Sequence, residues 1–140
     1  MAADGQTKKV IDDLEGFSSK LVTRLMLDLR ANVIEETPVD TGWARANWLF
    51  GVGSQPEDPG SVGGKDREAL LARVAGRRAA AAGTEIDVIS YSIADGSVWL
   101  SNFVPYIVVL NEGHSSQAEP GWVQASIQKA IIENTRRAAT

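Results

Sequence analysis

The stretch TKKVIDDLEGFSSKLVTRLMLDLRANVIEE, residues 7–36, decides the fold of this 140-residue chain. Its apolar side chains return every three or four positions, the spacing that places them on one face of an α-helix. They are Val10, Leu14, Phe17, Leu21, Leu25, Leu29 and Val33. Thr37-Pro38 ends the helix, because a residue before proline is pushed out of helical geometry. A helix of about 30 residues is about 45 Å long, more than a domain of this size is wide. We therefore expect part of it to contact another subunit.

A change of hydrophobic period after this helix predicts strands. Between residues 46 and 53 the apolar side chains alternate, with Trp48, Phe50 and Val52 at every second position. This alternation predicts a strand with one strongly apolar face. Before it, in residues 37–42, Asp40 can accept backbone N–H groups and Gly42 can adopt a positive φ, which predicts a turn. A second strand is predicted at residues 97–102.

Further helices and a loop are predicted around these strands. Residues 54–64 hold two prolines and three glycines and predict a long mobile loop. Residues 65–82 are rich in Ala, Leu and Arg and predict a helix. A short helix is expected from Pro105 to Gly113. A last helix is expected from Pro120-Gly121 to about Arg136-Arg137, with an apolar face. That face comprises Trp122, Val123, Ile127, Ala130 and Ile131.

Residues 84–93 are ambiguous between helix and strand. Their Ile, Val and Tyr side chains favour a strand, whereas Thr84 with Asp87 resembles a helix capping box. We favour the helix. The whole pattern predicts one α+β domain spanning residues 1–140, in which a long N-terminal helix and a C-terminal helix pack on a small antiparallel β-sheet.

Composition excludes several classes of function. The chain has no cysteine, which rules out disulfides, thiol nucleophiles and iron–sulfur clusters and fits a reducing compartment such as the cytoplasm. The formal net charge of −4 provides no basic field for binding a phosphate backbone. No stretch approaches the roughly 18 apolar residues of a membrane span.

The motifs of catalysis and cofactor binding are missing as well. His114 is the only histidine, and its spacing from Glu112 matches no metal-ligand pattern. The glycine-rich segments do not fit a phosphate-binding or dinucleotide-binding fingerprint. We therefore predict no catalytic residue, no metal and no cofactor. A basic cluster of Arg73, Arg77 and Arg78 leaves open nucleic-acid binding, although a solvated helix face is the simpler interpretation.

Three segments, taken together, resemble a known family. They are TPVDTGWARANW at residues 37–48, VWLSNFVPY at residues 98–106, and LNEGH at residues 110–114 ahead of PGWV at residues 120–123. Their order and spacing are similar to those of the tail-completion, or neck, proteins of long-tailed bacteriophages, the group of the lambda tail-completion protein Z. Residues 56–93 match that pattern little. The matching positions are Pro38, Asp40, Thr41, Gly42, Arg45, Trp48, Asn102, Pro105, Tyr106, Glu112 and Gly113.

The resemblance implies a virion protein without enzymatic activity, made in the host cytoplasm and placed at the head–tail junction. It implies a homo-oligomeric ring or partial ring around the DNA channel, docked on connector proteins and on the tail-tube or tail-terminator protein. The motif residues would build the fold: Asp40 and Gly42 set the turn, and Arg45 pairs with Asp40 or Glu112. Pro105, Tyr106 and Gly113 would place the short helix against the sheet.

Two alternatives remain. One is a tail terminator or another minor tail protein, which differs only in its docking partner. The other is a nucleic-acid-associated phage accessory protein that uses the arginine cluster. In every case we expect partners to contact the exposed part of the first helix and the loops at residues 54–64 and 113–119, because binding residues concentrate on exposed segments.

Overall fold

The computed structural model describes residues 2–39, 42–60, 67–113 and 115–138, and it is an α+β fold. The helices are α1 (Ala2–Glu36), α2 (Arg67–Gly83), α3 (Glu85–Ile89), α4 (Ile107–Asn111) and α5 (Trp122–Ala138). Two short 3-10 helices, η1 (Arg45–Asn47) and η2 (Ile93–Asp95), and two strands, β1 (Leu49–Val52) and β2 (Val98–Ser101), complete the elements. The long first helix, the last helix and the two-stranded antiparallel sheet confirm the predicted fold class.

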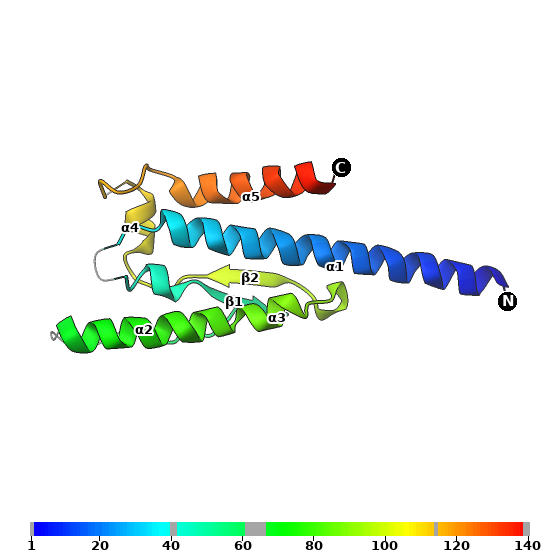
Figure 1. The fold of residues 1–140 in the computed structure, drawn as a ribbon, viewed down its shortest axis with the longest axis horizontal. Helices are drawn as coiled ribbons and strands as arrows, with labels where there is room; N and C mark the ends of the chain where they lie inside the picture. The colour runs from blue at the N-terminus through cyan, green and yellow to red at the C-terminus, as the bar shows by residue number, and fades with distance from the viewer. Residues whose placement is uncertain (1, 40–41, 61–66, 114, 139–140) are drawn as a thin grey trace.

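The elements form layers around α1. Figure 1 shows α5 along one side of α1, the sheet along the other, and α2 and α3 beyond the sheet. The strands pair antiparallel, with Leu49 opposite Ser101 and Val52 opposite Val98. The N-terminal part of α1 extends past the ends of α5 and of the sheet layer (Figure 1). Helix α1 is therefore longer than the rest of the fold, as its sequence predicted, and the other elements cover only part of it.

Strand β1 is shorter than the sequence pattern predicts, and both of its faces are buried. Residues 45–47 form the 3-10 helix η1, in which the Ala46 amide donates to the carbonyl of Gly42 at 3.0 Å. Phe50 faces α1, where the Arg30 guanidinium lies 5.9 Å from its ring centroid. Successive strand residues point to opposite faces, so Leu49 points toward the α2–α3 layer, and it is also buried. The prediction of a single apolar face was wrong, because helices cover both sides of the strand.

The ambiguous segment is helical, as favoured, over residues 85–89. The Thr84 side chain does not cap this helix; its hydroxyl oxygen accepts the Phe50 amide at 3.1 Å and donates to the Ala81 carbonyl at 2.6 Å. A capping box instead opens η2, where the Ser92 hydroxyl accepts the Ala94 amide and the Asp95 carboxylate accepts the Ser92 amide at 2.9 Å. Thr84 thus ties the outer edge of β1 to the end of α2.

The buried face of α5 matches the predicted one at Trp122 and Ala130 and differs from it elsewhere. Trp122, Ser126, Ala130 and Asn134 are buried at intervals of four, whereas Ile127 and Ile131 are exposed. Polar side chains occupy the buried row because each has a partner: Ser126 donates to the Trp122 carbonyl, and Asn134 donates to Asp28 on α1 at 2.9 Å. Small and hydrogen-bonded side chains let α5 approach α1 closely, and the larger isoleucines stay outside.

Candidate functional site

A junction between the end of α1 and the tryptophans of the core holds the molecule together. Thr37 is fully buried, and its hydroxyl donates to the Val33 carbonyl and accepts the Trp48 indole N–H at 2.9 Å. The ring of Trp48 packs edge-on against Trp122, with centroids 6.3 Å apart. The Trp122 indole N–H in turn donates to the Leu110 carbonyl at 3.0 Å. The C-terminal end of α1, the segment before β1, α4 and α5 therefore meet at one buried point.

The TPVDTG segment is described only in part. Pro38 is buried and Gly42 has a φ of 88°, which confirms the expected positive φ. A side chain at this glycine would also contact Val74 on α2. Asp40 and Thr41 lie outside the described residues, and with them the proposed Arg45–Asp40 pair. The neighbouring Val39 exchanges two hydrogen bonds, both 2.8 Å, with the side-chain amide of Gln117.

Arg45 acts on the end of α1. Its guanidinium donates to the carbonyls of Glu35 and Thr37, at 3.1 and 3.0 Å. Those carbonyls lie at the C-terminal end of a helix, where a cation is favoured by the unpaired acceptors and by the helix dipole. The expected partner Glu112 forms no ion pair with it among the described residues. Arg45 is therefore a helix-capping residue in this structure.

The second motif segment fixes β2 to η1. The Asn102 side chain donates to the Ala44 carbonyl at 2.9 Å and accepts the Val104 amide at 3.1 Å, which turns the chain toward α4. Pro105 and Tyr106 are exposed and form the turn before α4, which begins at Ile107 rather than at Pro105. The helix packs inward through Ile107 and Leu110, which contact both buried clusters of the core.

The third segment closes α4 against the start of α5. Gly113 has a φ of 95° and lies so close to Pro120 that a Cβ would approach its ring to 2.5 Å. Glu112, just before it, is exposed. His114 lies outside the described residues. Asn111, which the sequence analysis did not single out, accepts the Val123 amide at 2.9 Å and so caps α5. Its place just before Glu112-Gly113 was the available signal.

Another connector that sequence reasoning missed is Arg30. It is 6% exposed, donates to the Trp48 carbonyl at 3.0 Å and pairs with Glu85 on α3 at 2.8 Å. In the sequence, Arg30 could not be distinguished from the solvated charges beside the apolar face of α1, because its partners belong to other elements. Arg30 joins α1, β1 and α3.

The arginine cluster of α2 is partly used within the fold. Arg77 lies 4.8 Å from the ring centroid of Trp43 and donates to the Asn47 side chain at 2.7 Å. A cation over an indole ring and a charge-assisted hydrogen bond are structural contacts. Arg78 is exposed. The three arginines therefore do not form one open basic surface.

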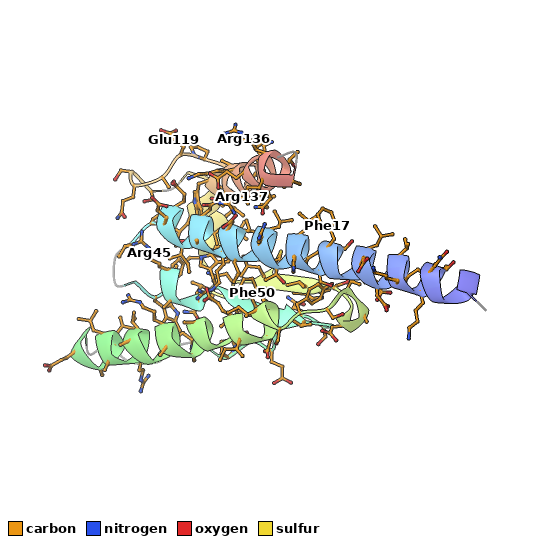
Figure 2. All side chains as sticks on the ribbon, turned by 45° about the vertical axis from the view of Figure 1, so that its right-hand side comes forward. Phe17, Arg45, Phe50, Glu119, Arg136 and Arg137 are labelled. Carbon is orange, nitrogen blue, oxygen red and sulfur yellow. The ribbon has the colours of Figure 1, made fainter. Side chains whose placement is uncertain are left out.

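The largest exposed apolar surface of α1 lies in its N-terminal part. We call residues 5–17 the outer half of α1 and residues 21–36 the inner half. Along the same stripe, Val33 in the inner half is 1% exposed, whereas Val10, Leu14 and Phe17 in the outer half are 57%, 59% and 55% exposed. Figure 2 shows Phe17 on the part of α1 that runs beyond α5. Exposed apolar stripes of this kind mark protein interaction sites.

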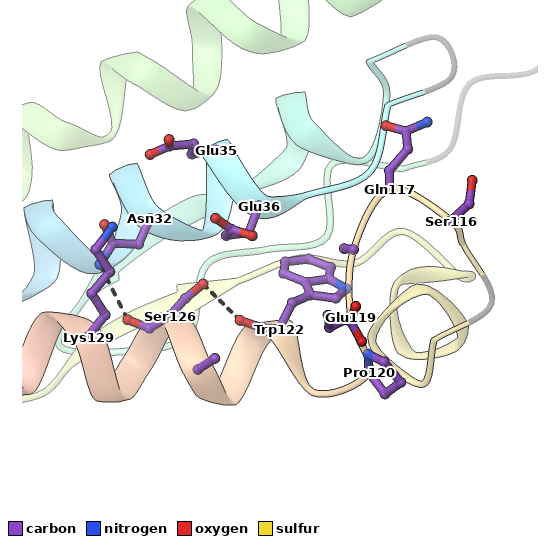
Figure 3. A pocket seen from close by; sticks show the side chains of 12 residues that line it. Asn32, Glu35, Glu36, Ser116, Gln117, Glu119, Pro120, Trp122, Ser126 and Lys129 are labelled. Atoms are coloured by element: carbon purple, nitrogen blue, oxygen red, sulfur yellow. Dashed lines mark hydrogen bonds between the residues drawn. The ribbon is translucent and has the colours of Figure 1, made fainter.

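A cavity of about 420 Å³ lies at the opposite end of the molecule (Figure 3). It opens between the C-terminal end of α1 and the loop before α5, with Trp122 in its wall. Its charged lining consists of Glu35, Glu36, Glu119 and Lys129, so acidic groups predominate. Among its described lining residues there is no hydrogen-bonded pair of nucleophile and base.

The described part of the chain contains neither a metal-binding cluster nor a membrane-spanning helix. Within it, no three His, Cys, Asp or Glu side chains are grouped so that they could hold a metal ion. No helix in the same ranges combines the length and the apolar character needed to cross a membrane. Comparison of the chain with protein-family models, curated proteins and solved structures found no match.

Proposed function

We propose that this chain is a structural subunit of a tailed bacteriophage particle, a tail-completion or neck protein at the head–tail junction. The observation that carries the structural role is the outer half of α1, whose apolar stripe is exposed along a helix that extends past the rest of the molecule. Exposed apolar surface of this kind marks a site that another molecule covers, and in an assembly that molecule is a neighbouring subunit.

The location in a phage rests on the motif resemblance. Residues of all three motif segments join elements rather than line a reactive site: Arg45 caps α1, Asn102 turns β2 toward α4, and Gly113 closes α4 on Pro120. Motif residues of this kind are expected in a structural subunit, whose function depends on its shape rather than on a reactive site. In this proposal copies of the chain form a ring or partial ring around the DNA channel, between the connector and the tail tube.

The nucleic-acid alternative has less support. It needs the α2 arginines as a phosphate-binding surface, and Arg77 is already held by Trp43 and Asn47. It predicts DNA binding that falls steeply with salt, whereas the neck proposal expects no binding that survives physiological salt. A tail-terminator role shares the assembly class and differs in the protein to which the ring docks.

Antibody labelling of intact source particles, viewed by negative-stain electron microscopy, tests the proposal. Label restricted to the head–tail junction is the expected result, and label at another part of the tail would favour a different minor tail protein. Particles without label, from a preparation in which the same antibody binds the free protein, would contradict a virion role. An antibody against an abundant head protein serves as the matched control for access.

A further inference from the structure

The backbone of β2 has hydrogen-bonding groups on both edges, and β1 uses only one edge. In an antiparallel pair, every second pair of opposite residues exchanges both backbone hydrogen bonds. The Gly53 amide donates to the Ser97 carbonyl at 2.7 Å, so in the observed register Trp99 and Ser101 also direct their N–H and C=O groups toward β1. The backbone groups of Val98 and Leu100 therefore point away from β1.

The two outer edges of the sheet differ in their partners. On β1, the outward amide of Phe50 donates to the Thr84 hydroxyl at 3.1 Å, which closes that edge. On β2, the backbone groups of Val98 and Leu100 have no hydrogen-bond partner among the described residues. The Leu100 side chain is only partly buried, although it packs on the cluster around Val33. The edge of β2 can therefore pair with another extended strand.

Strand β2 lacks the features that usually protect a sheet edge. Natural edge strands carry charges, prolines or bulges that prevent pairing with other chains. Residues 96–104, GSVWLSNFV, contain no charged residue and no proline. Trp99, in the middle of β2, is 43% exposed, whereas the other tryptophans of the chain are buried. An uncharged strand does not select its partner by charge, so backbone register and the exposed indole must do so.

The sequence of β2 is chemically symmetric about Trp99. Residues 97–101 read SVWLS, which is serine, aliphatic, tryptophan, aliphatic and serine in either direction. Antiparallel pairing with an identical strand therefore places each type of side chain opposite its own type. Large aliphatic and aromatic cross-strand pairs of this kind stabilise a sheet. A second copy of the same chain fits this edge in shape and in polarity.

We infer that β2 pairs antiparallel with β2 of a second copy, across a two-fold axis at Trp99. Val98 then lies opposite Leu100 of the second copy, and each outward N–H meets an outward C=O. The two Trp99 side chains form a non-hydrogen-bonded pair, in which Cα atoms lie about 4.5 Å apart and side chains are closest. A shift of two residues in either direction would place Trp99 opposite a serine instead.

The inference goes beyond the proposed function and does not depend on it. A contact between the same surface of two copies closes with those two copies. A ring of more subunits would need a further surface, and the outer half of α1 stays available for that purpose.

Cysteine cross-linking tests the register, because the chain has no cysteine. In the inferred dimer, Ser97 of one copy lies opposite Ser101 of the other, at a Cα separation that a disulfide can span. Mildly oxidised mixtures of Ser97→Cys and Ser101→Cys should give a mixed dimer in higher yield than either variant alone. Ser90→Cys, at an exposed serine after α3, replaces Ser97→Cys in the control. A yield no higher than in the control, or equal self-cross-linking of a single variant, overturns the inference.

Hydrogen exchange measured by NMR tests the backbone pairing in the unaltered protein. The amides of Trp99 and Ser101 bind β1 and should exchange slowly at every protein concentration. Those of Val98 and Leu100 should exchange fast in dilute protein and about tenfold more slowly once the dimer predominates. Fast exchange at all concentrations overturns the inference, and so does protection that arises only when a different protein is added.

A substitution at the symmetry axis tests the aromatic pair. Trp99→Lys removes both indoles from the contact and places two lysines opposite each other, which is destabilising. In sedimentation velocity it should weaken dimerisation by about tenfold or more, and circular dichroism checks that the variant is folded. Ile86→Lys, at a residue 68% exposed on α3, is the matched control and should leave dimerisation unchanged. Unchanged dimerisation of Trp99→Lys overturns the inference, as does an unaltered chain that is monomeric at every concentration.

Discussion

The inner and outer halves of α1 have the same kind of sequence and different surroundings. Both carry an apolar residue every three or four positions, yet Val33 is buried and Val10 is largely exposed. The inner half is covered by α5 on one side and by the sheet on the other (Figure 1). Amphipathic spacing thus predicts that a helix buries one face, and it does not say whether the covering surface belongs to the same chain.

The largest expected effect comes from the tryptophan at the end of the inner half. Trp48→Ala should lower the free energy of unfolding by about 3–5 kcal/mol, because it leaves a cavity beside Val33 and Trp122. Thermal or urea unfolding measures it. Trp99→Ala is the matched control, since Trp99 is 43% exposed on β2 and should cost much less. Equal losses would mean that the buried junction is no more important than the edge of the sheet.

Removing one hydroxyl at the same junction should have the next largest effect. Thr37→Val keeps the shape but leaves the Trp48 indole N–H buried without its acceptor, and it should cost about 2–3 kcal/mol. Urea unfolding is the measurement, with Thr135→Val, an exposed threonine of α5, as control. A loss under about 0.5 kcal/mol, the range of ordinary surface substitutions, would show that the Thr37 hydroxyl does not stabilise the junction.

A single pair of substitutions compares the two halves directly. Val33→Ala deletes two buried methyl groups and should cost about 2 kcal/mol. Val10→Ala makes the same chemical change in the outer half and should alter the free energy of unfolding by less than about 0.5 kcal/mol. Both are measured in dilute protein, so that self-association does not contribute. A large loss at Val10 would show that the outer half is packed within a single chain.

The smallest effect concerns local opening of the outer half. Gly16→Ala adds a methyl group into open space and should favour the helix by about 0.5–1 kcal/mol. We expect slower hydrogen exchange of amides in residues 5–17 with little change in melting temperature, because this part opens without global unfolding. Gly76→Ala, equally open but on packed α2, should raise the melting temperature itself. A higher melting temperature for Gly16→Ala would show that the outer half unfolds together with the rest of the fold.

Much of the fold followed from local pattern. The end of α1 before Thr37-Pro38 and the helix of α2 depend on steric rules and helix propensities that act within a few residues. The errors lie where contacts with distant elements override local preference. Residues 45–47 form η1 rather than strand, and α5 buries Ser126 and Asn134 rather than its isoleucines.

The candidate site was only partly predictable for the same reason. Gly42 was expected in a turn and Gly113 at the end of the short helix, and both have positive φ. Arg30 and Asn111 were missed, because their partners Glu85 and the Val123 amide belong to elements whose positions the sequence does not give. The contacts of Arg45 with two backbone carbonyls could not be predicted either, because the direction of those carbonyls depends on how the helix ends.

By itself the sequence determined the long amphipathic helix, the change of period after it, the absence of cysteine and the order of the motifs. Backbone sterics and side-chain periodicity act locally, so they can be deduced without coordinates. Only the tertiary structure decided which part of the α1 stripe is covered and which polar groups are buried with partners. Those properties depend on the distance between residues far apart in the chain, which local physics does not fix.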